Sequence, residues 1–476
     1  MPRPPRPLRL RRAVVAWTLT FVCLTIGGTV AGPPDVDAAR SRAFTRPLVI
    51  PKVITSADIT LHAVQADVQI LPGKRTRMWT YGGTFPGPTI RRPAGRTTRL
   101  TLVNDLPASA GSLTLHNHGN HSTPESDGQP DAYLAAPGGG TVTYTYTGTE
   151  AGGDERGATQ WYHDHRMDVT GRNVWMGLAG MYIIDDPTDP QTLPKGAYDV
   201  PLLVADRSFD ATNQLHYVFD QNGDMGDTTL VNGVPQPYFA MADRRYRFRI
   251  LNASNARSYT FALTGGLSFL QVGTESGLLP APVRRKSIQL APAERAEVIV
   301  DFAGRMGQRI VLRDVSADGA QRDVMQLRVV RHAKDDSSVP AMLRPLPQLG
   351  ATIARSRTFE FGQDRFSKQW TINGRTYDPE RVDASPKLGT TEEWTFVNKS
   401  GLAHVVHVHD VDQQLVSRDG KPPRPWELMK ESWALGIGET ITVKLELTDN
   451  TGVFMLHCHI LEHEDAAMMT QFDVVP

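Results

Sequence analysis

The strongest constraint on the fold is a strand-like segment that occurs three times along the chain. The three copies are Thr98–Asn104, Arg245–Asn252 and Glu393–Asn398. Each copy alternates polar and apolar residues and ends on Asn, as a half-buried strand does where it enters a turn. The three closing Asn residues are 148 and 146 residues apart. A repeat of this length indicates duplicated domains rather than the short units of a solenoid.

Further alternating segments fit each copy, and they lie at Thr141–Thr147, Ala296–Phe302 and Thr440–Leu447. The 41 glycines and 34 prolines are spread along the chain, which favours many short strands over long helices. We therefore predict an all-β protein of three sandwich or barrel domains. Links rich in Pro, Asp and Ser place these domains at residues 47–190, 195–335 and 352–476.

The N-terminal segment predicts export. Residues 1–12 carry five Arg and no acidic residue, and an apolar run follows from Ala13 to Ala31. A signal peptide over residues 1–31 has this layout, and Arg11-Arg12 is compatible with a twin-arginine signal. The alternative is an uncleaved anchor, because a run of about 19 apolar residues just spans a bilayer. Either way we expect a secreted or cell-envelope protein, and cleavage would remove Cys23 and leave Cys458 as the single cysteine.

The charge balance excludes one class of partner. The chain has 51 basic and 51 acidic side chains and no basic block, so its formal net charge is zero. Proteins that bind nucleic acid or anionic membranes by electrostatic attraction usually concentrate positive charge. We therefore expect neither kind of partner.

Histidine makes the sequence specific. Ten of the fourteen His residues fall in four short clusters, and each cluster contains a His-x-His pair. On a strand, residues i and i+2 point to the same face, so each pair directs two imidazoles the same way. Imidazole is a common protein ligand of copper, zinc, iron and nickel. The clusters are His116-Asn117-His118, His163-Asp164-His165, His404 to His409, and His457 to His463.

The pairs are in register across the repeat. His163 and His457 are 294 residues apart, as are the first and third closing Asn residues, and His116 and His407 are 291 apart. The first and third domains therefore carry pairs at equivalent positions, and the middle domain has none there. One such pair alone would indicate two surface histidines, but four in register argue against that. We predict that eight imidazoles converge on a multinuclear metal site between two domains, divided as three, three and two among three metals.

Strand alternation separates a second site. Cys458 lies between the two histidines of its pair and therefore faces away from them. His404 stands at an odd offset from the next pair, which also turns it to the opposite face, and His463 and Met468 follow the cysteine strand. Two His, one Cys and a distant Met form the ligand set of blue-copper electron-transfer sites. Because Cys458 is bonded in sequence to two cluster histidines, electrons would have a short covalent path between the two sites.

With these residues in view, the chain resembles the three-domain multicopper oxidases, and within them the bacterial spore-coat-type laccases. The resemblance covers residues 50–476. Besides the four histidine clusters it includes Gly83–Ile90, Tyr246–Asn255 and Leu290–Arg295. It implies three cupredoxin-like Greek-key domains and four bound copper ions, of which one is type 1, one is type 2 and two form a type 3 pair.

The resemblance also implies a role for each ligand. Type 2 copper would be held by His116 and His407, and type 1 copper by His404, Cys458 and His463 with Met468 as the axial residue. Met469 is the alternative axial residue. Asn117 and Val405-Val406 depart from the residues that many members carry there, but none of them is a ligand. The type 3 pair would be held by His118, His163, His165, His409, His457 and His459.

Two acidic residues are candidates for supplying protons to bound oxygen. Asp127 follows the first cluster and Glu464 follows His463, and the reduction of oxygen needs a nearby proton donor. The alternatives are a turn residue for Asp127 and a solvated charge for Glu464. The histidines outside the clusters are interpreted as structural or surface residues, and they are His62, His121, His216 and His332.

The function expected from the resemblance is a laccase-type oxidase, which removes single electrons from phenols or aromatic amines and reduces O₂ to water. The alternatives are a metallo-oxidase for Cu(I), Fe(II) or Mn(II) and, less favoured, a non-enzymatic envelope scaffold. The loop from Asp410 to Trp433 would border the substrate, with Met429 as a minor metal ligand. Trp426 and Trp433 would either offer apolar surface to an aromatic ring or serve only the packing of the loop. We expect a monomer whose partners are a small aromatic reductant or a reduced metal ion, and O₂.

Overall fold

The computed structural model describes residues 43–316 and 323–476. The signal peptide predicted over residues 1–31 lies outside this part of the chain, so both it and export remain predictions. Within the described residues, no helix combines the length and the apolar character that crossing a bilayer requires.

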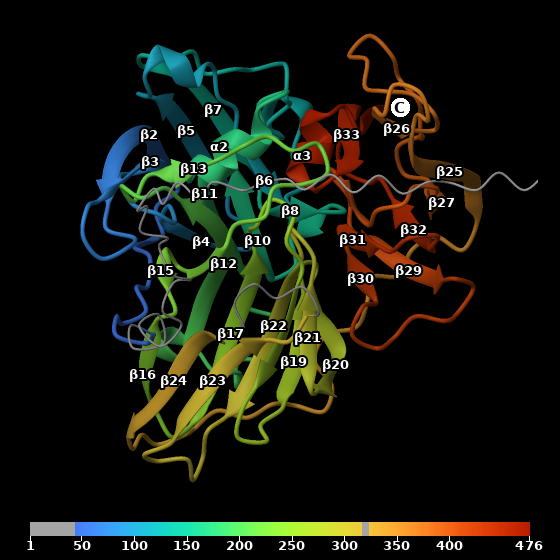
Figure 1. Cartoon of the computed structure of the whole chain (residues 1–476). Coiled ribbons are helices and arrows are strands. Elements are labelled where there is room, and N and C mark those ends of the chain that lie inside the picture. The colour runs from blue at the N-terminus through green and yellow to red at the C-terminus, as the bar shows by residue number, and fades with distance from the viewer. Residues whose placement is uncertain (1–42, 317–322) are drawn as a thin grey trace, which may run out of the picture. The chain divides into compact units, whose positions relative to one another are not determined.

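Nine strands form the two main sheets of the first domain, drawn in blue and teal in Figure 1. The first sheet has the order β3-β2-β5-β7 and the second the order β1-β4-β11-β10-β6. The bounds are β1 Val53–Ile54, β2 Asp58–Val68, β3 Thr76–Tyr81, β4 Thr89–Pro93, β5 Thr98–Asn104, β6 His116–His118, β7 Gly140–Tyr146, β10 Ala158–His163 and β11 Ala179–Asp185. A small hairpin pairs β8 Thr149–Glu150 with β9 Gly153–Asp154.

The middle domain has an eight-stranded and a five-stranded sheet, in green to yellow in Figure 1. The larger runs β15-β14-β12-β17-β22-β19-β20 with β13 on β12, and the smaller runs β16-β24-β23-β18-β21. The bounds are β12 Asp199–Phe209, β13 Leu215–His216, β14 Thr228–Val231, β15 Val234–Pro235, β16 Tyr238–Ala242, β17 Arg245–Asn252, β18 Tyr259–Leu263, β19 Phe269–Thr274, β20 Gly277–Arg285, β21 Ser287–Leu290, β22 Arg295–Asp301, β23 Arg309–Asp314 and β24 Asp323–Arg331.

The third domain has sheets of six and four strands, in orange to red. Their orders are β26-β25-β27-β32-β29-β30 and β31-β28-β33-β34. The bounds are β25 Ile353–Gln363, β26 Trp370–Ile372, β27 Thr391–Asn398, β28 His404–Val408, β29 Gln413–Arg418, β30 Met429–Lys430, β31 Ser432–Leu435, β32 Thr440–Glu446, β33 Gly452–Cys458 and β34 Met469–Val474.

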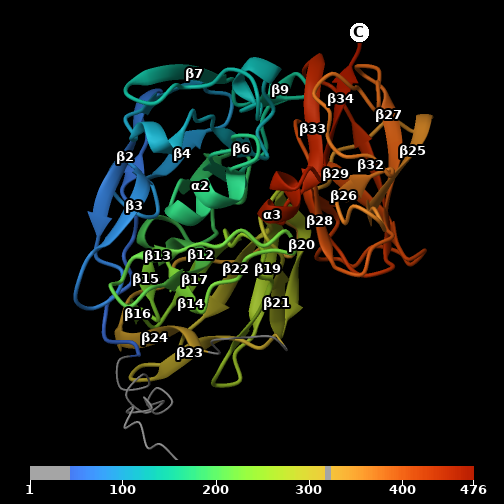
Figure 2. The same cartoon turned by 45° about the horizontal axis from the view of Figure 1, so that its top comes forward.

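Helices are few and short in the described residues. They are α2 Thr170–Met176, α3 Leu461–Asp465 and the 3-10 turns η1 Ala108–Ala110, η2 Pro124–Ser126 and η3 Gly196–Tyr198. Helix α3 of the third domain packs against α2 of the first (Figure 2). The predicted all-β class is therefore confirmed, and every named sheet takes its strands from a single domain. The predicted domain limits themselves remain predictions.

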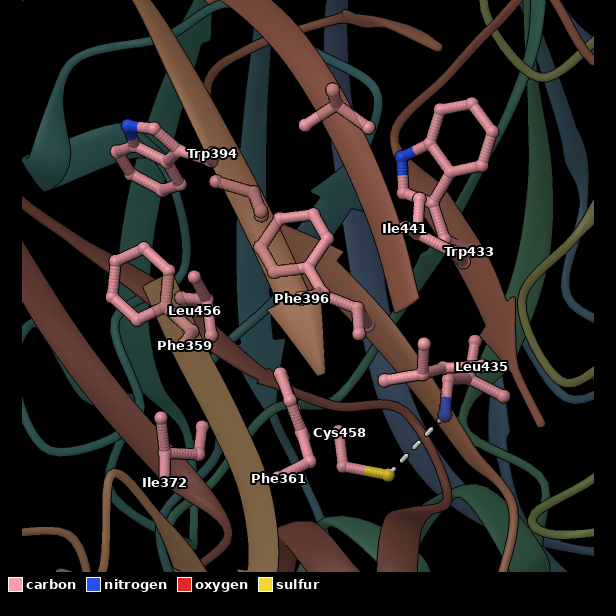
Figure 3. Close-up of a cluster of buried hydrophobic side chains, with 14 of the residues drawn as sticks. Phe359, Phe361, Ile372, Trp394, Phe396, Trp433, Leu435, Ile441, Leu456 and Cys458 are labelled. Atoms are coloured by element: carbon pink, nitrogen blue, oxygen red, sulfur yellow. Dashed lines mark hydrogen bonds between the residues drawn. The ribbon is translucent and has the colours of Figure 1, made fainter. Parts of the chain in front are cut away.

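Each domain encloses its own apolar core. In the third domain, the inward residues of β27 and β25 bring Trp394, Phe396 and Phe359 into one cluster with Leu456 from β33. Figure 3 shows Cys458 at one end of this cluster. The core therefore holds the C-terminal end of β33 in place, and with it the cysteine and the histidines on either side.

The Asn that closes each repeated segment has a defined structural role. The Asn252 amide group donates to the carbonyls of Arg257 (2.7 Å) and Leu290 (3.0 Å), and its Oδ1 accepts the Ser254 N–H at 3.0 Å. Asn104 and Asn398 each bridge a following turn in the same manner. The repeated Asn is therefore a buried clamp on the loop that leaves the strand, which explains its recurrence in three domains.

We predict that Asn252→Ala lowers the local stability of the middle domain by about 3 kcal/mol, because it leaves two buried carbonyls and one N–H without partners. Hydrogen exchange of peptides from β17 and β22 measures this locally, without assuming a two-state protein. Gln308→Ala, an exposed change in the same domain, is the control and should change exchange by less than about 0.5 kcal/mol. Equal exchange in the two variants would contradict the clamp role.

Candidate metal centre

Antiparallel pairing brings the histidine clusters together within each domain. In the first domain β6 pairs with β10, so that His116 lies opposite His163. In the third domain β28 pairs with β33, so that His407 lies opposite His457. Each domain therefore presents two His-x-His segments side by side at one edge.

The two edges meet, and imidazole nitrogens from the first domain contact those from the third. The Nε2 atoms of His116 and His407 are 3.2 Å apart, those of His118 and His459 are 2.9 Å apart, and those of His165 and His409 are 3.3 Å apart. Groups of three donor atoms lie within 4.8 Å of one another. These groups are His116, His118 and His407; His118, His163 and His459; and His165, His409 and His457.

The contacts of the Nδ1 atoms, which point out of the cluster, show how the Nε2 lone pairs are oriented. The Nδ1 atoms of His116 and His163 lie 2.6 and 2.7 Å from backbone carbonyl oxygens, and that of His409 lies 2.7 Å from an Asp127 oxygen. A ring that donates its Nδ1–H outward keeps the Nε2 lone pair directed inward, as in metal-binding histidines. Lone pairs that face one another repel unless a cation lies between them. The donor set therefore fits metal ions.

Burial favours the neutral form of four of the cluster rings, those of His118, His163, His407 and His409. Burial, and then the neighbouring imidazoles, lower the pKa values of His118, His163 and His409 well below the usual range. Burial also lowers the pKa of His407 to about 4, against the opposing effect of Glu431. Only the neutral imidazole has a lone pair for a metal, so at neutral pH this site is ready to bind one.

The residues predicted for the second metal site, called here the sulfur group, also lie close together. The Sγ of Cys458 is 3.6 Å from Nδ1 of His404 and 3.5 Å from Nδ1 of His463, and the two nitrogens are 3.1 Å apart. The backbone N–H of Val405 donates to the sulfur at 3.5 Å (dashed in Figure 3). Burial raises the pKa of the Cys458 thiol to about 12. A thiolate here therefore needs a bound cation, and two imidazoles with one sulfur suit copper.

Met468 is buried just before β34, and its backbone carbonyl accepts the Cys458 N–H at 3.0 Å. Its own N–H donates to the carbonyl of His463 at 2.9 Å. Met469 is the first residue of β34 and lies opposite His457, a histidine of the other group. The backbone therefore ties Met468 to two members of the sulfur group, while the axial role of its thioether remains a prediction.

Trp370, which sequence reasoning missed, covers the sulfur group. Its ring centroid is 4.4 Å from that of His463 and 5.3 Å from that of His404, and its indole N–H donates to the Gln221 carbonyl at 2.6 Å. A single Trp on a three-residue strand carries no periodic signal, so nothing in the sequence identified it.

Both predicted acidic residues are buried against the histidines. Asp127 Oδ2 is 2.7 Å from Nδ1 of His409, and Asp127 Oδ1 is 3.4 Å from Nδ1 of His116. The two carboxylate oxygens of Glu464 are each 3.1 Å from an Nδ1, one of His165 and one of His457. Glu464 is 2% exposed, so it is not a solvated charge. Burial alone would raise the pKa of Glu464, but the two imidazoles hold it well below its usual range.

A third carboxylate, Glu431, was not predicted. It contacts Nδ1 of His118 at 3.2 Å, Nδ1 of His407, and the guanidinium of Arg295 from β22 of the middle domain. Burial would raise the pKa of Glu431, but Arg295 and then His407 hold it well below the usual range. Glu431 stands in a segment of mixed polarity, so the local sequence did not identify it. Its partner Arg295 is the last residue of Leu290–Arg295, one of the motifs that resemble the family.

The structure also shows the exposure and contacts of the remaining histidines and of the candidate substrate loop. His62, His216 and His332 are exposed, whereas His121 is buried and its Nδ1 lies 3.0 Å from Asp449. The segment predicted as a loop contains β29, β30 and the start of β31, and Trp433 on β31 is fully buried in the third-domain core, where its indole N–H donates to Gln413. Met429 is 4% exposed, and Trp426 is half-buried beneath Arg285, whose guanidinium carbon is 3.9 Å from the ring centroid. Of these three, only Trp426 offers accessible apolar surface.

Comparison with known proteins agrees with this geometry. Three family models, each described as multicopper oxidase, match residues 62–189, 203–323 and 352–476. The chain is 33% identical to a laccase of Bacillus subtilis, over 84% of this chain and 90% of that protein. It is also 33% identical to a bilirubin oxidase of Albifimbria verrucaria, over 83% of this chain and 72% of that protein.

Among solved structures, a multicopper oxidase from Pediococcus acidilactici matches with a TM-score of 0.82 and 32% identity, covering 90% of this chain and 91% of the other. This match confirms the predicted cupredoxin-like fold. The chain belongs to the multicopper oxidase family, as a copper-binding oxidoreductase of the laccase type that passes electrons from small-molecule substrates to O₂.

Proposed function

We propose that this protein oxidises phenols and aromatic amines one electron at a time and reduces O₂ to water with four copper ions per chain. The observation that carries this proposal is the position of Cys458 between the two donor groups. Its thiol faces His404 and His463, while its sequence neighbours His457 and His459 face the histidine cluster. The laccase relatives support a phenolic substrate.

In this proposal the ligands divide as the resemblance implies. His404, Cys458 and His463 would hold the type 1 copper, with Met468 as a further, weaker ligand. His116 and His407 hold the type 2 copper. The type 3 pair takes His118, His163, His165, His409, His457 and His459. Bound copper supplies the one-electron redox steps and the reduction of O₂, which no amino-acid side chain here performs.

The chain's own residues connect the two donor groups, orient the ligand rings and supply protons. The backbone and side chain of Cys458 provide the covalent route to His457 and His459. Asp127 and Glu464 each contact two ligand rings and hold their orientation, and both are placed to pass protons toward the cluster. Glu431 is kept ionised by Arg295, so we assign it to orienting His118 and His407.

We predict that the fully loaded protein contains four copper ions per chain and is intensely blue, because both donor groups are complete. Metal analysis and the visible spectrum check this together. One copper per chain after full loading would refute the trinuclear group. A folded, copper-loaded protein without strong visible absorption would refute the type 1 group.

We predict that Cys458→Ser abolishes the blue absorption and nearly all turnover, while three coppers stay bound. A serine hydroxyl replaces a thiolate ligand poorly, and His457 and His459 point away from residue 458 toward the other six cluster imidazoles. Copper content, the visible spectrum and phenol oxidation are measured on the same preparation. Phenol oxidation near the wild-type rate would contradict the proposed electron route.

We predict that a dimethoxyphenol is oxidised with higher catalytic efficiency than Cu(I) held in a weak complex. Soft Cu(I) is captured by thioethers, and Met429, the one methionine in the candidate substrate loop, is buried. Initial rates with both substrates, for the wild type and for Met429→Leu, provide the comparison. A strong preference for Cu(I) that Met429→Leu removes would make this protein a metallo-oxidase instead.

A further inference from the structure

A cavity of about 350 Å³ lies between the middle and third domains, and its wall includes a proposed type 1 ligand. The consecutive residues Ala403, His404 and Val405 line it, together with Ile460, the residue that follows His459. This volume lies in the range of small-molecule sites. A second cavity, of about 690 Å³, is lined by residues between 91 and 249 and includes none of the proposed ligands.

The other approach to the sulfur group is covered. His463 is fully buried and Trp370 lies against its ring, while the third-domain core packs around Cys458. Electrons pass efficiently only over short distances, so a reductant needs to bind close to the type 1 ligands. The cavity beside His404 offers such a place.

The charges in the cavity wall are not balanced locally. Its three carboxylates already have cationic partners: Glu294 pairs with Lys430, and Glu427 and Glu439 lie 3.5 and 2.8 Å from Arg418. Arg295 is neutralised by Glu431. Two further cations, Arg285 and Arg424, complete the wall.

Arg285 has no carboxylate partner among residues 43–316 and 323–476. Its guanidinium lies 3.9 Å from the Trp426 ring centroid and donates to Gln271 at 3.0 Å. Arg424 is 3.8 Å from Glu427, a carboxylate that Arg418 also engages. Burial lowers the pKa of Arg285 more than the nearby Glu427 raises it, which is the expected cost of a half-buried cation that forms no ion pair. An anion bound between Arg285 and Arg424 would remove that cost.

We propose that this cavity is the reductant site and that it selects phenols carrying a carboxylate, with the carboxylate on Arg285 and Arg424 and the ring beside Trp426. This inference rests on the proposed function. Each bound phenol gives one electron to the protein and its hydroxyl proton to water, and leaves as a phenoxyl radical that keeps its carboxylate. Four such phenols supply the four electrons that convert one O₂ and four protons to two waters.

The kinetic test compares syringate with its neutral methyl ester, which share the same reacting ring. We expect the wild type to favour syringate in kcat/KM, and Arg285→Gln to reduce that preference about tenfold, the loss expected for one charge-assisted hydrogen bond. The loss should appear in KM, since the electron route from His404 is unchanged. Arg285→Lys keeps the charge and should retain most of the preference.

Arg284→Gln is the matched control. It removes the same charge one residue away on β20, from an exposed side chain that does not line the cavity. The proposal requires that it leave the preference within about twofold of wild type. An equal loss of the preference for syringate in both variants would show a general effect of surface charge and would contradict the proposed carboxylate site.

A binding measurement separates this inference from the proposed function. Calorimetry of the copper-loaded protein with 3,4,5-trimethoxybenzoate, which has no phenolic hydroxyl to oxidise, reports binding without turnover. We expect binding that Arg285→Gln or Arg424→Gln weakens about tenfold, and little binding of the neutral methyl ester. Equal binding of the acid and the ester, unaffected by either variant, would overturn the inference about the carboxylate site. A copper-loaded enzyme that oxidises neither syringate nor its ester would instead overturn the proposed function.

Discussion

The structure depends on holding imidazole nitrogens against one another in a site that is buried from solvent. Rings such as His118 and His459 approach within 2.9 Å through their Nε2 atoms, an arrangement with no hydrogen bond to stabilise it when both nitrogens are lone-pair acceptors. Most of the outer Nδ1 atoms lie against Asp127, Glu464 or Glu431 or against backbone carbonyls. These carboxylates fix ring orientation, and their negative charge favours cations in the cluster.

The same constraint explains what the middle domain contributes although it carries none of the clustered histidines. It supplies Arg295, whose guanidinium bonds Glu431 and so keeps that carboxylate ionised beside two ligand rings. It also supplies one wall of the cavity beside His404. The middle domain, which has no metal ligands, thus contributes the positive charge of Arg295 beside the histidine cluster and part of the wall of the proposed reductant site.

Local patterns in the sequence were enough to predict the fold and much of the site. The alternation before Asn104, Asn252 and Asn398 predicted β5, β17 and β27, because strand pairing and an Asn clamp both leave a short-range signature. The histidine pairs could be predicted because duplication repeats their spacing. Glu431 and Trp370 could not, because Glu431 meets His118 and Arg295 from other domains and Trp370 meets His463 from another sheet, and nothing in the local sequence records those contacts.

Strand β33 shows how one local rule produces the link between the two groups. Because side chains alternate across a strand, His457 and His459 cannot share a face with Cys458, so adjacent residues necessarily serve different sites. The third-domain core fixes the end of this strand through Leu456 and its neighbours, and the Val405 N–H fixes the sulfur. A one-residue shift in the pairing of β28 with β33 would turn the ligands of one strand to the opposite face from those of the other. The register in which His407 lies opposite His457 therefore determines the electron path as well as the fold.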